Sequence, residues 1–170
     1  MKKLLAAAAL AALSIGSAQA DTVSFSDSFG LATTNWSHNL SLSKFDTSLG
    51  TLNSVTFTYG GMVSSIFRLE SLDAAPATVT ATANGTLNFG GPISDILNIS
   101  GSASKVLTAF DGLIDFGGTS GGIVGPVVGD DSKSLLLVSG LGAFEGIGSY
   151  DILVAAAGLF SASGAGNLIS

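Results

Sequence analysis

Aspartates are the side chains of this sequence best suited to chemistry. Asp111 and Asp115 stand four residues apart, and Asp130 and Asp131 are adjacent. Ca²⁺ binds six to eight oxygen atoms, which carboxylates clustered on loops can supply. If the two pairs meet at one end of the fold, they form a calcium site. The alternative is that all four are solvated aspartates in turns, because the spacing of an EF-hand loop is missing.

Catalysis by a nucleophile and base would depend on His38, the only histidine. It lies in the polar stretch 35–39, which we expect to be an exposed loop before a strand. The sequence has no Gly-x-Ser-x-Gly elbow of a serine hydrolase. Paired carboxylates for glycoside hydrolysis would have to come from the same aspartates, without a recognisable glutamate partner. We therefore expect no catalytic residue and no enzymatic activity.

Trp36 is the best candidate for contact with a ligand. Aromatic rings pack well on flat apolar surfaces while their polar atoms remain hydrated, which suits the apolar face of a sugar. In a polar loop at 35–39, Trp36 would be free to stack on a glycan. Tyr59 and Tyr150 accompany apolar strand residues, so we expect them in the core or at its rim. The sequence thus offers one weak glycan-binding residue.

The composition excludes several classes of protein. Of 170 residues, 46% are apolar, 11% are charged and none is cysteine. Without cysteine the chain forms neither a disulfide scaffold nor a thiolate metal site. Six basic residues against twelve acidic ones cannot supply the basic face of a nucleic-acid binder. We expect no nucleic-acid partner and, calcium apart, no cofactor.

Residues 1–20 have the three parts of a secretory signal peptide. Lys2 and Lys3 precede an apolar run over 4–13, and Ala18-Gln19-Ala20 supplies small residues for cleavage. That run is half the length a bilayer-spanning helix needs. Cleavage after Ala20 leaves four basic and twelve acidic residues, a net charge of −8. We expect export to the periplasm, the cell surface or the medium.

Beyond residue 20, apolar and polar residues alternate with the period of two that is typical of half-buried strands. Turn signals, among them several glycine pairs, recur about every ten residues, which favours a sandwich or barrel. Asn84-Gly85 predicts a hairpin, 116–131 a glycine-rich loop, and 140–146 at most a short helix. The expected strands cover 22–26, 40–43, 54–59, 78–83, 86–89, 93–99, 106–110, 134–138 and 150–154.

We predict one all-β domain over residues 21–170, an antiparallel two-sheet sandwich resembling a jelly roll. An outer-membrane barrel is the alternative, although aromatic girdle residues and lumen charges are scarce. The most apolar later segment, 152–160, is too short for a membrane-spanning helix. It predicts a buried strand, so the mature chain has no expected transmembrane segment.

Four short motifs resemble the choice-of-anchor E domain, a family of exported bacterial proteins. They occur in the family's order across nearly the whole mature chain, and each consists mainly of turn residues. In the first, Asp46 can form an Asx turn and Gly50 can adopt backbone conformations that other residues resist. The motifs are Phe45–Val55, Asp115–Gly121, Phe144–Gly148 and Gly164–Asn167.

The resemblance implies an exported, β-rich domain with a surface destination and no enzymatic activity. Family members often end in a sorting tail with a Pro-Glu-Pro motif, a membrane helix and a basic end. This sequence stops at Ser170 without such a tail and without the family's last strand, as in a released member or a truncated gene. We expect a structural or interaction domain of the cell surface or extracellular matrix, with polysaccharide or other surface proteins as partners. The alternatives are a glycan-binding module and a calcium-stabilised surface domain.

Overall fold

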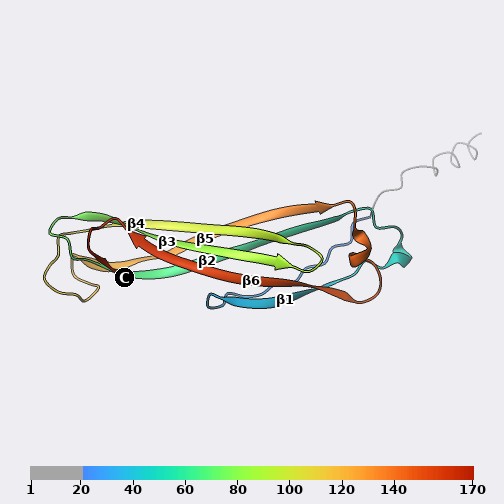
Figure 1. The fold of residues 1–170 in the computed structure, drawn as a ribbon, viewed down its shortest axis with the longest axis horizontal. Coiled ribbons are helices and arrows are strands. Elements are labelled where there is room, and N and C mark those ends of the chain that lie inside the picture. The colour runs from blue at the N-terminus through green and yellow to red at the C-terminus, as the bar shows by residue number, and fades with distance from the viewer. Residues whose placement is uncertain (1–20) are drawn as a thin grey trace, which may run out of the picture.

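The computed structural model describes residues 21–170, so the predicted signal peptide lies outside the described residues. Two antiparallel sheets pack face to face, which confirms the predicted all-β sandwich (Figure 1). One sheet has the strand order β1-β6-β3-β4 and the other β5-β2-β7. The strands are β1 (Trp36–Ser43), β2 (Val55–Ser71), β3 (Ala77–Gly90), β4 (Asp95–Leu107), β5 (Gly121–Leu137), β6 (Ser149–Ser163) and β7 (Leu168–Ile169).

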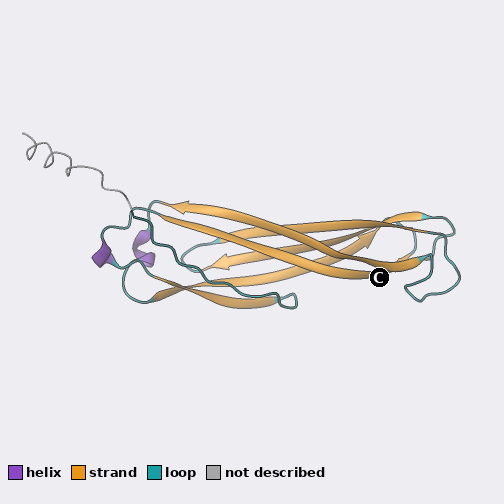
Figure 2. Ribbon diagram, turned by 180° about the vertical axis from the view of Figure 1, so that it is seen from behind, coloured by secondary structure: helices purple, strands orange, loops and turns teal. Residues whose placement is uncertain are grey.

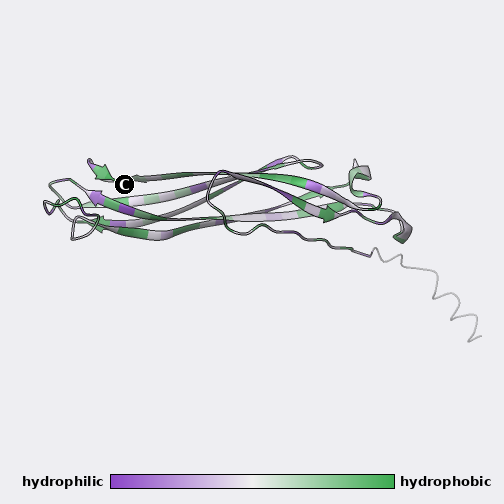
Figure 3. Ribbon diagram, turned by 90° about the horizontal axis from the view of Figure 1, so that it is seen from below, coloured by the Kyte–Doolittle hydropathy of each residue, from purple (hydrophilic) through white to green (hydrophobic). Residues whose placement is uncertain are grey.

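Alternation along the strands builds the core, as the period-two pattern predicts. In β2 the inward-facing Phe57, Val63 and Phe67 are buried, while the intervening polar residues face solvent. Val79 and Leu107 are fully buried from the other sheet. Each such side chain stabilises the fold by about 1.5–3 kcal/mol relative to an exposed one. Figure 3 shows the resulting change between apolar and polar positions along the strands.

Two dipeptides expected to end strands, Asn84-Gly85 and Gly60-Gly61, lie inside strands. β3 runs through Asn84-Gly85, so the predicted hairpin there is wrong, and the turn to β4 lies at residues 91–94. A Cβ on Gly85 would lie 3.3 Å from Cβ of Val63 in the facing sheet. Gly85 therefore permits a close approach of the two sheets, which is one use of glycine within strands.

The predicted loop over 116–131 is correct only up to residue 120. From Gly121 the chain enters β5, which pairs with β2 over most of both strands. Gly60-Gly61 does not break β2 either. Gly61 faces Leu87 of the other sheet, and a Cβ atom on Gly61 would overlap the Leu87 side chain. Neighbouring strands thus provide the hydrogen bonds that let these glycine-rich segments extend.

The two flanks of the sandwich differ. On one flank, the outer strands β4 and β5 come into close contact between the sheets. We call the opposite flank, formed by the outer edges of β1 and β2, the open flank. Of β2, only Glu70 and Ser71 have a partner on that side, the short strand β7.

Two 3₁₀ helices lie at one end of the molecule, η1 (Thr47–Leu49) and η2 (Leu141–Phe144) (Figure 2). The second falls within the short helix predicted for 140–146. Neither helix of residues 21–170 has the length or hydrophobicity needed to cross a bilayer. Residue 21 lies toward this end, and the carboxyl terminus lies toward the other (Figure 1).

Candidate functional site

The four sequence motifs meet in pairs at opposite ends of the sandwich. The first and third form one contact, which we call the Phe45 joint. Phe45 donates its N–H to the carbonyl of Phe144 at 2.8 Å and accepts from the N–H of Gly146 at 3.0 Å. The ring of Phe144 is buried against Phe57, with centroids 5.4 Å apart. This joint fastens the start of β2 to the loop before β6.

Asp46 orders the turn beside the Phe45 joint, as the first motif predicts. Its Oδ1 accepts the N–H of Ser48 at 2.8 Å. That hydrogen bond lowers the pKa of Asp46, because it stabilises the charged carboxylate. Gly50 follows at φ +139°, a conformation that favours glycine. The predicted Asx turn and the role of Gly50 are both confirmed.

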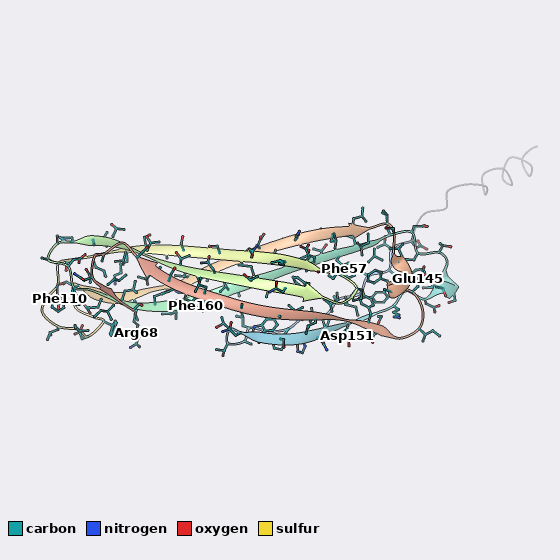
Figure 4. The ribbon with its side chains drawn as sticks, viewed as in Figure 1. Phe57, Arg68, Phe110, Glu145, Asp151 and Phe160 are labelled. Carbon is teal, nitrogen blue, oxygen red and sulfur yellow. The ribbon has the colours of Figure 1, made fainter. Side chains whose placement is uncertain are left out.

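The second and fourth motifs are joined at the other end through residues 70–73, in what we call the Glu70 joint. Asp73 holds the last motif by two hydrogen bonds. Its Oδ2 accepts the N–H of Gly166 at 2.7 Å, and its Oδ1 accepts that of Asn167 at 2.9 Å. The carbonyl of Asn167 in turn accepts the N–H of Leu72. Figure 4 places Phe110 and Arg68 at this end, and Phe57 and Glu145 at the Phe45 end.

Glu70 is fully buried within this joint. Ser120, also fully buried, donates its hydroxyl to Oε1 of Glu70 at 2.5 Å and its carbonyl accepts the N–H of Ser71. Oε2 of Glu70 has no hydrogen-bond partner among the described residues. It lies over Gly121, where a Cβ would overlap it. The second motif therefore covers a buried carboxyl group, a relationship that the sequence analysis missed.

Asp111 and Asp115 support the loop that leads into the Glu70 joint. Asp111 accepts the N–H groups of Leu113 at 3.1 Å and Thr119 at 3.2 Å, and these bonds lower its pKa. Asp115 accepts the N–H of Gly117 at 2.8 Å. Both carboxylates thus hold main chain, as expected for turn-forming aspartates.

The predicted calcium residues do not come together. Asp130 and Asp131 are exposed in the middle of β5, opposite Met62 and Gly61 of β2. At the usual rise per strand residue, Asp130 is about 30 Å along β5 from its start beside the other pair. Within residues 21–170, no three acidic or histidine side chains are grouped to hold a metal ion.

Asp95 accepts hydrogen bonds from Lys133 and Tyr59 in a polar cluster between the two sheets. Nζ of Lys133 lies 2.7 Å from Oδ1, and the hydroxyl of Tyr59 donates to Oδ2. Lys133 first, and then Tyr59, lower the pKa of Asp95 to about 2. Burial, followed by the Asp95 bond, raises the pKa of Tyr59 to about 12. Tyr59 packs on Phe89 at 4.4 Å, which agrees with its predicted place at the core rim.

Trp36 and His38 lie on a strand, so the loop predicted for 35–39 is wrong. β1 begins at Trp36, and both side chains are half-buried on its inner face. Phe29 covers them, with ring centroids 4.8 Å from Trp36 and 4.2 Å from His38. This placement does not favour glycan stacking on Trp36, whose ligand role stays a prediction. Polar residues at 35, 37 and 39 hide the strand pattern because they form its outer face.

The open flank contains a groove of about 1820 Å³. The segment 21–34 lines it as extended chain without strand pairing, together with residues of β1 and the first half of β2. Most of the groove's other lining residues are apolar, among them Leu40, Val63 and Leu87. The groove can accommodate an extended polypeptide segment. The only sequence feature that points to such a segment is the alternation of apolar and polar residues at 22–26.

Comparison with models of protein families, with curated proteins and with solved structures finds no match for this chain.

Proposed function

We propose that this chain is an exported, non-enzymatic structural or interaction domain of the bacterial cell surface or extracellular matrix. The observation that carries the proposal is the use made of its acidic side chains. Asp46, Asp73, Asp111 and Asp115 all hold main-chain N–H groups in turns. Groups that an enzyme would expose to substrate thus hold together the two ends of a sandwich.

The sequence supports the same destination. Residues 1–20 have the pattern of a secretory signal, and the four motifs resemble the choice-of-anchor E domain. In the fold these motifs form the Phe45 joint and the Glu70 joint. If proteins with these motifs share this architecture, they would need the same joints. This would account for motifs that consist mainly of turn residues.

The outer face of the four-stranded sheet is mainly polar and nearly uncharged, and the exposed apolar residues Ile96, Val106, Leu153 and Leu159 interrupt it. Cross-strand pairs of hydroxyl and amide groups cover it, including Thr80 with Ser104 at 2.9 Å and Asn84 with Ser100 at 2.8 Å. Such a face has no charges to repel or attract a neutral polymer. Extracellular polysaccharide is therefore one partner class that we propose.

The outer face of the other sheet carries an apolar patch. Ile66 and Ile123 are 64% and 56% exposed, and Met62 and Val128 are about half exposed. They lie on the same side of β2 and β5, which are paired. Exposed apolar patches commonly mark contacts between proteins, so other surface proteins are the second proposed partner class.

Fractionation of the native host tests the proposal. Immunoblotting should find the protein in the medium, the matrix or the surface fraction. A variant lacking residues 2–20 is the control and should remain in the cytoplasm. A wild-type protein distributed like this control would overturn the proposal. So would turnover of a substrate by the purified protein that is lost in His38→Ala.

A further inference from the structure

Two main-chain edges are unpaired along the open flank. Among residues 21–170, β1 pairs only with β6, and its other edge has no strand beside it. β2 pairs with β5 on one side, and within the described residues its opposite edge is unpaired from Val55 to Leu69. Free edges of this length are templates for another strand.

The segment 21–34 lies at these edges without using them. It makes no backbone–backbone hydrogen bond with any described residue. Val23 and Phe25 are each 45% exposed and Phe29 is 44% exposed. The segment is tied to β1 by a side chain, because Oδ2 of Asp27 accepts the N–H of Ser41 at 2.8 Å. Its apolar residues thus remain only half-buried in their own molecule.

The direction of the segment relative to β2 follows from its contacts with β1. Asp27 contacts Ser41 and Phe29 contacts Trp36, so the segment is antiparallel to β1. β1 is antiparallel to β6. β6 and β2 run the same way, since Tyr150 lies by Phe57 and Phe160 by Phe67. The segment is therefore parallel to β2, whereas every strand pair in both sheets is antiparallel.

We propose that the open flank is an assembly site for a second copy of this chain, whose segment Thr22–Phe29 adds to β2 as an antiparallel strand. Strand addition draws its affinity from main-chain hydrogen bonds and its specificity from pockets for alternate side chains. Val23 and Phe25 would enter the groove, and Thr22, Ser24 and Ser26 would face outward. Donor and acceptor occur in every copy, so copies link into closed dimers or longer chains.

This inference rests on the proposed structural function, and it identifies the partner as the chain itself. The occupant follows from the donor's own pattern. Residues 22–26 alternate as a strand does but lie unpaired, and a copy entering in the opposite direction supplies the antiparallel geometry that the chain's own segment cannot. Residues 31–35 connect this segment to β1 and would serve as the hinge.

The oligomeric state of the protein, purified after export through its own leader, tests the inference. Light scattering from micromolar to submillimolar concentration should show dimers or longer species for the wild type. Phe25→Asp should be monomeric, because a charge in an apolar groove is costly. Leu113→Asp is the control outside the donor segment, the hinge and the groove, since Leu113 is 66% exposed, and should assemble like the wild type. Val23→Asp provides a second donor variant, and circular dichroism checks that each remains folded.

Mixing experiments identify the site. Phe25→Asp retains the groove, so adding it should shorten wild-type assemblies. The chain has no cysteine, so Ser24→Cys and Thr58→Cys proteins can be mixed and treated with a short bis-maleimide. Cross-linked pairs of the two variants support the inference. A monomeric wild type, assembly that survives Phe25→Asp, or no Ser24→Cys to Thr58→Cys product between chains would overturn it. Each of these failures leaves the export test above unaffected.

Discussion

The main chains of Gly101 in β4 and Gly129 in β5 lie in direct contact, with no side chain between them. A Cβ atom on Gly101 would overlap the carbonyl group of Val128, and one on Gly129 would overlap that of Ser100. β4 and β5 belong to different sheets and are not paired. Two glycines thus close one flank of the sandwich by backbone packing, which leaves the opposite flank as its open side.

Alanine at either glycine should destabilise the protein by about 3 kcal/mol, a typical upper cost of overfilling a packed site. Neither glycine has a positive φ, so the loss would come from overlap rather than backbone strain. Gly142→Ala is the control, because nothing lies within 4 Å of its added Cβ. Urea unfolding measures the difference. If Gly101→Ala and Gly129→Ala unfold at the same midpoint as Gly142→Ala, the described contact is wrong.

Strand content could be predicted from sequence because alternation is a local signal. Phe57 and Val79 stand at apolar positions of such runs and are buried as expected. The prediction that glycine ends a strand is wrong where the glycine is required by a contact with the facing sheet. Gly85 and Gly61 are needed for contacts with Val63 and Leu87, residues distant in sequence. A local rule that reads glycine as a turn cannot detect such a contact.

The candidate site was predictable to a smaller extent, for a related reason. Asp46 bonds to a residue two positions away, and the Asx turn is visible in sequence. Glu70 bonds to Ser120 across 50 positions. Its only local signal is an acidic residue within a largely apolar run, beside Leu69 and Leu72. The four predicted calcium ligands do not lie together, because strand β5 places Asp130 and Asp131 far from the loop that contains Asp111.

Removing the carboxylate of Asp73 should loosen the Gly164–Asn167 motif. Asp73→Ala loses two hydrogen bonds from main-chain N–H groups, and we expect a loss of about 2 kcal/mol, typical of hydrogen bonds to charged groups. Hydrogen exchange should accelerate at Gly166 and Asn167 and stay unchanged in the Phe45 joint. Asp73→Asn keeps one acceptor oxygen and should lie between the two. Equal exchange in all three proteins would contradict the assigned role of Asp73.

The buried pair at the Glu70 joint predicts an asymmetry between two variants. Ser120→Ala removes the hydroxyl that donates to Oε1 of buried Glu70, and a stranded buried polar group costs about 1–3 kcal/mol. Glu70→Gln keeps an acceptor for the Ser120 hydroxyl and should cost less. Thermal or urea unfolding at neutral pH compares the two. The reverse order would mean that Glu70 has another partner.

The Asp95 cluster should contribute stability that depends on pH. The pKa of Asp95 falls from 3.8 to about 2 in the folded protein, so the folded state binds fewer protons than the unfolded state between these values. Its stabilisation is therefore complete above about pH 4 and is lost as pH falls through 2. The difference in unfolding free energy between wild type and Asp95→Asn should shrink over this range. Ser37→Ala, on an exposed residue of β1 that does not titrate, is the control, and its difference from wild type should stay nearly constant.

The same cluster can be followed from the phenol of Tyr59, because the chain has only two tyrosines. Burial is the larger cause of its pKa of about 12 and Asp95 the smaller. Asp95→Asn should therefore lower this pKa but leave it above 10. The pKa of Tyr150 is raised by burial alone and should not move, which makes it an internal control. Absorbance titration at high pH measures both, with Tyr150→Phe to assign the two transitions. An unchanged Tyr59 transition in Asp95→Asn would show that the two side chains are not hydrogen-bonded in solution.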